Sequence, residues 1–315
     1  MFYFVIQQSM FFAIPLMIVA LGGLFSEKSG VVNIALEGKM VMGAFTGILF
    51  IHSFQDRLPG QPILILALLV AIGVGVIVSL FHAYAAINLG ANQIISGVAI
   101  NMFAPAFAVY SSRLITGTQN IHFTNQFRIE SVPLFGRIPV LGPMFFQGAY
   151  FTTYLGFVIL IVTSFVLYKT RFGLRLKACG EHPQAADSVG VSVAKMRYSG
   201  VMLSGALAGL GGLVWIIPIS NIFTGTVNGY GFLALAVLIF GGWKPQRILV
   251  AAFFFGFMQA IAASYMAIDF LRDSGIPAHF YRMLPFIATL VVLAFTSKNT
   301  MAPKAVGQPY DKGSR

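Results

Sequence analysis

The stretch that decides the fold is residues 62–86, PILILALLVAIGVGVIVSLFHAYAA, in which no Asp, Glu, Lys or Arg occurs. A membrane-spanning helix needs about 20 consecutive, mostly apolar residues, and this stretch meets that requirement. Similar runs occur along the whole chain, at roughly 8–25, 31–51, 62–86, 92–112, 149–168, 198–219, 230–243, 247–268 and 282–297. The sequence therefore predicts an all-α fold, a polytopic bundle of about eight to ten transmembrane helices.

The composition of the chain supports a membrane location. Of the 315 residues, 57% are hydrophobic and 9% are charged, and the mean hydropathy is +0.84. An average soluble domain carries roughly 25% charged residues, so we expect lipid around this chain. The net charge of +11 is thinly spread, which excludes a nucleic-acid partner. A single cysteine, Cys179, excludes an internal disulfide and a Cys-based metal cluster. Residues 1–315 are therefore interpreted as one transmembrane domain.

Basic residues indicate the orientation of the bundle. By the positive-inside rule, the loop 169–197 and the tail 298–315 are predicted to be cytoplasmic. Counting spans backwards from them places the segment 113–148 and the N-terminus outside. The assignment rests on Lys169, Arg171, Arg175, Lys177, Lys195 and Arg197 in the loop and on Lys298, Lys304, Lys312 and Arg315 in the tail.

The long segment 113–148 is not expected to span the membrane, because it contains Pro133, Pro139 and Pro143 and several glycines. Three interpretations of this segment are open. The segment forms an ordered external cap, a docking surface for an outside partner, or a plain connecting loop.

Two of the apolar runs differ from a plain lipid-facing helix. The second carries Asn33, Glu37 and Lys39 in its first half, and the seventh is short. We expect both to be discontinuous. The related sequences Gly30-Val31-Val32-Asn33 and Gly225-Thr226-Val227-Asn228 precede these two runs, as in transporters built from an internal repeat. A match this short also arises by chance.

Polar side chains inside the runs are candidates for a substrate path. Glu37 is the only acidic residue well inside a predicted span, and Asn33 lies one turn before it on the same helix face. Either Asn33, Glu37 and Asn228 line a path, or Glu37 makes a structural hydrogen bond to a neighbouring helix.

The fourth run carries the largest set of uncharged polar groups. Gln93, Gly97 and Asn101 recur every four residues, and Asn92 and Ser96 form an adjacent row. Such a stripe faces other helices rather than lipid. The stripe suits a path for a neutral polar solute, such as a sugar or a nucleoside, or it joins helices to one another.

In the sixth run, small residues including the Gly205–Gly209 pair predict close helix packing.

The basic loop contains a predicted short amphipathic helix. Pro183 suits a first helical turn and Gly190 suits a helix end, with basic residues such as Arg175 on either side. The segment is either a docking element for a cytoplasmic partner or a solvated loop. The docking interpretation rests on Arg175, Glu181, His182, Pro183, Ala186, Asp187 and Gly190.

Recognisable catalytic motifs are absent from the sequence. It contains no G-x-x-x-x-G-K-[ST] phosphate loop, no H-E-x-x-H and no G-x-S-x-G. We therefore expect a transport subunit rather than an enzyme, with no metal site. A stand-alone secondary carrier is the alternative from another class, although the sparse intramembrane charges argue against it.

Four stretches resemble a known family. The run 25–38, FSEKSGVVNIALEG, looks like the signature of permease subunits of bacterial ABC importers for simple sugars, branched-chain amino acids and nucleosides. The stretches 90–97, 175–190 and 302–310 resemble nucleoside-type members most closely. One departure is the stretch 242–249, GWKPQRIL, where the family more often has small residues after the proline.

The resemblance implies a membrane-spanning importer permease that moves nucleosides inward by alternating access in a bacterial cell membrane. A simple-sugar permease of the ribose or galactose type is the nearest alternative. The implied partners are a second homologous permease, a cytoplasmic ATPase and an extracytoplasmic substrate-binding lipoprotein. This chain would hold no cofactor, because ATP and Mg would bind the ATPase. The family's coupling helix would correspond to residues 181–190.

Overall fold

The computed structural model describes residues 2–133, 136, 138–139, 142–273, 275–296 and 302–311. Lys298, Lys312 and Arg315, which entered the orientation argument, lie outside the described residues. Among the described residues, six helices are long and apolar enough to cross a membrane. They are α1 (Phe2–Lys28), α3 (Gln61–Ala83), α4 (Gln93–Thr116), α5 (Phe151–Lys169), α8 (Val193–Ile219) and α10 (Pro245–Ser264). The all-α, polytopic fold is confirmed.

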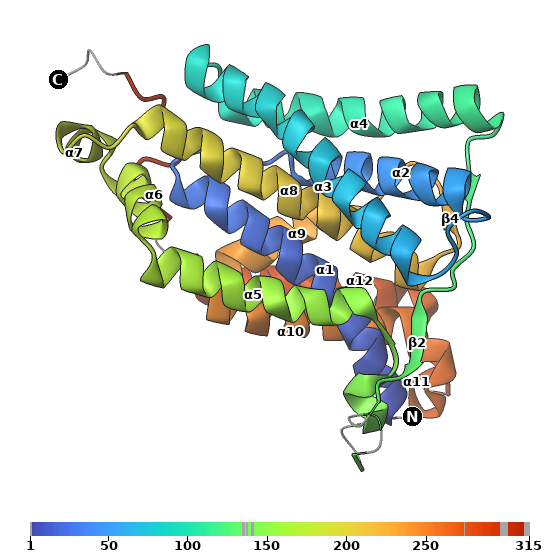
Figure 1. Ribbon diagram of the computed structural model, residues 1–315. Coiled ribbons are helices and arrows are strands. Elements are labelled where there is room, and N and C mark those ends of the chain that lie inside the picture. The colour runs from blue at the N-terminus through green and yellow to red at the C-terminus, as the bar shows by residue number, and fades with distance from the viewer. Residues whose placement is uncertain are drawn as a thin grey trace.

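Helix α1 forms the centre of the bundle. Every residue from 9 to 27 is buried, and α8, α9 and α10 pack around it (Figure 1). A helix that is apolar on all sides can be buried on all sides. By contrast, α4 lies at the edge of the bundle, and large apolar side chains such as Met102 and Phe103 are exposed on it.

Helix α8 packs closely against α3 and α2 (Leu36–Phe54) through small residues. A methyl group added at Gly205 would overlap Ser79 and the carbonyl oxygen of Gly75, and one added at Gly209 would overlap the carbonyl oxygen of Ala71. The predicted small-residue packing of this helix is therefore confirmed. Only glycine permits this approach, because the facing atoms belong largely to backbone.

Two of the apolar segments are discontinuous, as predicted. Helix α2 begins only at Leu36, and residues 29–35, the unwound segment, connect it to α1 without regular helix. Helix α9 (Tyr230–Phe240) has 11 residues, about half of what a bilayer requires. Helix α12 (Ala278–Thr296) and the short helix α11 (Asp269–Arg272) complete the C-terminal part.

The two ends of the bundle differ, and the termini lie at opposite ends (Figure 1). At the end near the N-terminus, the described residues of segment 113–148 include the strands β1 and β2 and the start of β3. Two small antiparallel sheets form there, β1 with β4, which follows α8, and β2 with β3. These elements are β1 (Ile121–His122), β2 (Arg128–Ser131), the π-helical turn η3 (Gly142–Phe146), β3 (Gln147–Tyr150) and β4 (Ile222–Phe223).

The other end contains the basic loop, which holds two helices. Helix α7 (Pro183–Ser188) is the predicted short helix, with Pro183 in its first turn and Gly190 at a φ of 82° beyond its end. Helix α6 (Arg171–Glu181) was not predicted, since its residues were interpreted as a basic flank. Thr170 caps it by accepting a hydrogen bond from the Gly173 N–H.

Candidate functional site

The unwound segment is held in place by side chains of α4. Gln93 Oε1 accepts a hydrogen bond from the Val32 N–H at 2.7 Å. Asn101 bridges two backbone groups: Nδ2 donates to the Ile34 carbonyl oxygen and Oδ1 accepts from the Gly38 N–H, both at 2.8 Å. Backbone that leaves a helix inside a membrane protein must find such partners. The predicted stripe on α4 thus faces another element of the bundle.

Ser96 and Asn92 occupy the adjacent row of that stripe. Ser96 Oγ lies 3.0 Å from His82 Nδ1, and His82 Nε2 lies 3.0 Å from the Val32 carbonyl oxygen, so α3 also contacts the unwound segment. Asn92 is exposed and caps α4, because its Oδ1 accepts from the Ile94 N–H at 2.9 Å. A polar side chain directly before an apolar run is the usual signal of such a cap.

Asn33 connects the unwound segment to two helices in the bundle interior. Its Nδ2 donates to Ser204 Oγ of α8 at 2.6 Å, and its Oδ1 accepts from Lys39 Nζ of α2 at 2.8 Å. Asn33, Lys39 and Ser204 are all fully buried. An ammonium group is costly to bury, so its hydrogen bond to Asn33 ties the unwound segment firmly to α2 and α8.

Glu37 binds the N-terminus of α9. Its two carboxylate oxygens accept hydrogen bonds from the Gly229 N–H at 2.9 Å and from the Gly231 N–H at 2.6 Å. Free N–H groups and the helix dipole make a helix N-terminus a favourable place for a carboxylate. Glu37 therefore makes the hydrogen bond to a neighbouring helix that was one of its two interpretations. It also joins the two discontinuous segments, α2 and α9.

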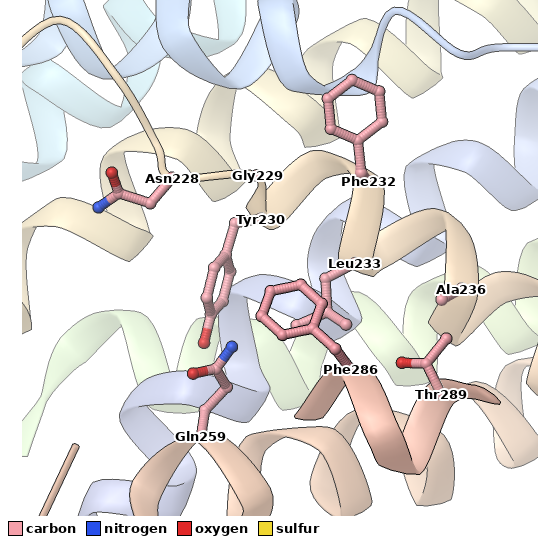
Figure 2. Close-up of a pocket in the computed structure, with 9 residues that line it drawn as sticks. All are labelled: Asn228, Gly229, Tyr230, Phe232, Leu233, Ala236, Gln259, Phe286 and Thr289. Carbon is pink, nitrogen blue, oxygen red and sulfur yellow. The ribbon is translucent and has the colours of Figure 1, made fainter. Parts of the chain in front are cut away.

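A pocket of about 290 Å³ lies between α9, α10 and α12 (Figure 2). This volume is near the lower end of small-molecule sites, roughly 300–1,000 Å³. Its walls are mainly apolar, with a few polar groups. The lining residues are Asn228, Gly229, Tyr230, Phe232, Leu233, Ala236, Gln259, Phe286 and Thr289.

Residues 302–311 form the C-terminal strap, which crosses the end of the bundle near α6 and α7. The Ala305 N–H donates to the Gly180 carbonyl oxygen at 2.9 Å, and the Gly307 N–H donates to the Gly30 carbonyl oxygen at 3.2 Å. The strap therefore touches both α6 and the unwound segment. From the sequence, this segment is expected to be a cytoplasmic tail, and these contacts were not predicted.

Arg197, at the start of α8, contacts the strap. It is 1% exposed, its Nη1 donates to the Gln308 carbonyl oxygen at 3.0 Å, and its guanidinium lies 5.9 Å from the centre of the Tyr310 ring. Tyr310 also packs on the buried cluster that includes Cys179. Burial raises the pKa of the Cys179 thiol.

Some of the predicted docking residues are buried or contact the C-terminal strap, and the others are exposed. Pro183 and Ala186 are buried, and Glu181 Oε2 accepts a hydrogen bond from the Lys304 N–H at 3.4 Å. Asp187 hydrogen bonds with Tyr310. Of the docking residues, Arg175, His182 and Gly190 are exposed, and so are Ala178, Gln184, Ala185, Ser188 and Val189 between them.

The corner 242–249, where the sequence departs from the family pattern, is well packed. Trp243 is buried, and its Nε1 donates to Glu27 Oε2 at 2.5 Å. Gln246 and Arg247 are exposed, while Ile248 is buried. The larger side chains of Gln246 and Arg247 are accommodated because they are exposed, while Ile248 packs in the apolar core.

Broken helices joined by buried hydrogen bonds, together with several long apolar helices, define a multi-pass membrane protein of the permease class. The chain belongs to the family described as the permease component of branched-chain amino acid transport systems, whose model matches residues 5–293. The resemblance inferred from the sequence is confirmed.

Several named proteins are similar to almost the whole chain. The guanosine ABC transporter permease NupQ of Bacillus subtilis is 45% identical over 99% of this chain and 97% of its own length. The nucleoside ABC transporter permease NupC of Lactococcus lactis is 37% identical over 98% of this chain and 96% of its own. A putative glucose ABC transporter permease of Haloferax volcanii is 29% identical over 95% of both chains. No solved structure matches.

Proposed function

We propose that this protein is the membrane-spanning permease subunit of a bacterial ABC importer, and that it moves nucleosides inward by alternating access. The observation that carries the proposal is the full-length similarity to two permeases named for guanosine and nucleosides, at 45% and 37% identity. The pocket, with its aromatic and amide side chains, suits such a solute.

An ABC permease works with an ATPase and a substrate-binding protein. In this chain the ATPase would bind the end formed by α6, α7 and the C-terminal strap, which faces the cytoplasm in our proposal. The basic residues on α6 support that orientation. The cap of β1 to β4 and the N-terminus would then face outside, toward a substrate-binding lipoprotein. A second, homologous permease would complete the pair.

The docking contact with the ATPase is proposed for the outward side of α7. Val189 is 77% exposed directly after this helix, so its apolar side chain is accessible to a partner. Glu181 and Asp187 would act indirectly, because both contact the C-terminal strap.

The substrate path is proposed to run past Asn228 and α9. Glu37 would shape it by holding the N-terminus of α9, and Asn33 by holding the unwound segment. Gln93 and Asn101 would support the same segment directly from α4, and Ser96 would do so through His82. Asn92 would act by capping the start of α4.

Uptake by the complete complex tests the proposal. Cells lacking this chain should lose most of their uptake of labelled guanosine, adenosine or uridine and regain it when the gene is restored. Unchanged uptake of every nucleoside would contradict the substrate assignment. The glucose-type relative makes a sugar permease the second candidate. In that case ribose, galactose or glucose, added in excess, would be transported or would compete.

A further inference from the structure

The pocket between α9, α10 and α12 contains a buried hydroxyl and a half-buried amide, and neither has a hydrogen-bond partner among the described residues. The Tyr230 hydroxyl has no hydrogen-bond partner among the described residues, although this side chain is only 3% exposed. Figure 2 shows the Gln259 amide directed toward it from α10, and within the described chain that amide has no partner either. A buried polar group without a partner is costly, so such a group indicates a missing ligand or water.

Aromatic rings surround these polar groups. Phe286 of α12 lines the same pocket, and Tyr230 stacks on Trp215 of α8 with ring centres 3.4 Å apart. The stacked Trp215 restrains the Tyr230 ring. An aromatic wall beside an amide and a hydroxyl suits a flat heterocycle, since its face can stack and its edge can hydrogen bond.

Other occupants fit the lining less well. A free sugar presents hydroxyl groups on all sides, and most of them would meet the apolar side chains of Leu233, Ala236 and Phe286. A lipid chain would leave the Tyr230 hydroxyl and the Gln259 amide without partners. An amide can donate and accept at once, and in this way glutamine pairs with the edge of an adenine.

We propose that this pocket binds the base of the transported nucleoside, with Phe286 stacking on the ring and with Gln259 and Tyr230 hydrogen bonding to its edge. The inference rests on the proposed function and adds the part of the substrate that this chain recognises. Glu37 contributes from a distance, because it fixes Gly229 and Gly231 on either side of Tyr230.

The test uses the complete importer in proteoliposomes and measures the KM for guanosine, adenosine, uridine and cytidine. Phe286→Leu and Gln259→Leu are each expected to raise the nucleoside KM about tenfold. Phe286→Leu should affect purines more than pyrimidines, because larger rings stack more strongly. The matched control is Phe257→Leu, on the same helix as Gln259, where the side chain is 42% exposed and lies outside the pocket.

Photolabelling gives a second measurement that does not depend on transport rates. An 8-azidopurine nucleoside should label peptides of α9, α10 or α12 in the wild-type complex, with labelling reduced in Gln259→Leu and competed by unlabelled guanosine. Unchanged KM values in both variants, or labelling confined to other helices, would overturn the pocket assignment. If the wild-type complex transports no nucleoside at all, the proposed function fails instead.

Discussion

Glu37 brings a carboxylate into the bundle interior and uses both of its oxygens on backbone N–H groups of a helix far away in sequence. If an NH₂ group replaced one of these oxygens, it would face a backbone N–H of α9, and two hydrogen-bond donors would then meet without an acceptor. Single side chains of this kind, rather than extended polar surfaces, hold the discontinuous helices together.

We predict that Glu37→Gln destabilises the protein by about 1–3 kcal/mol, because one buried N–H of the α9 N-terminus loses its acceptor. The thermal unfolding midpoint of the detergent-purified protein measures the effect. Glu130→Gln, at an exposed position of β2, is the matched control. Equal midpoints for the two variants would show that the Glu37 hydrogen bonds contribute little.

Gly75 and Gly73 of α3 differ in how closely other atoms approach them. A methyl group at Gly75 would overlap the carbonyl oxygen of Gly205 on α8, whereas no atom lies within 4 Å of the corresponding position at Gly73. We predict that Gly75→Ala costs about 1–3 kcal/mol through overpacking. Gly73→Ala should be neutral or slightly stabilising, since alanine favours helix. Similar unfolding midpoints for both variants would contradict the close packing of α3 on α8.

Among the elements, α7 and its surroundings are the proposed contact with the ATPase. We predict that Val189→Asp lowers substrate-stimulated ATP hydrolysis at least several-fold while the permease still accumulates, because an exposed apolar contact becomes charged. Leu58→Asp, in the exposed turn between α2 and α3, is the control. Normal stimulation in Val189→Asp would refute the docking assignment.

The sequence was sufficient for some elements and not for others, and the reasons are physical. The apolar runs and the short α7 could be predicted, because length, proline and glycine act locally. Helix α6 could also have been found, since its buried residues Gly173, Leu176, Cys179 and Gly180 recur at helical spacing. The central place of α1 could not, because lipid-facing and buried helices are equally apolar.

In the candidate site, too, local features could be predicted from the sequence, whereas contacts between distant segments could not. Polar residues within the spans could be selected as important, and Asn33, Gln93 and Asn101 do join elements of the bundle. Their partners could not be predicted, since Asn33 and Ser204 are 171 positions apart. The pocket was also missed apart from Asn228, because Tyr230, Gln259 and Phe286 come from three helices and form no pattern along the chain.

For the molecule as a whole, the C-terminal strap joins the end of the chain to α6, α8 and the unwound segment. It covers Cys179, the single cysteine of the protein, which is fully buried. We predict that deleting residues 302–315 increases the rate of Cys179 alkylation by a maleimide at least tenfold at neutral pH. Burial raises the pKa of this thiol, so exposure should also increase its reactive thiolate fraction.

The control for this experiment is deletion of residues 312–315 alone, which leaves every described strap contact in place. Mass spectrometry of the intact chain counts the added label. A slow rate in both deletions would mean that Cys179 is protected without the strap, and the strap would then have no part in closing this end of the bundle.

The position of the strap has a consequence for how the protein is made. The ribosome makes residues 302–311 well after their partners at Gly30, Gly180 and Arg197. Until the strap emerges, Arg197 lacks the carbonyl oxygen of Gln308. Closure of this end of the bundle therefore depends on synthesis of the strap. A chain that stops before residue 302 would expose the uncovered end to membrane proteases before it could join an importer.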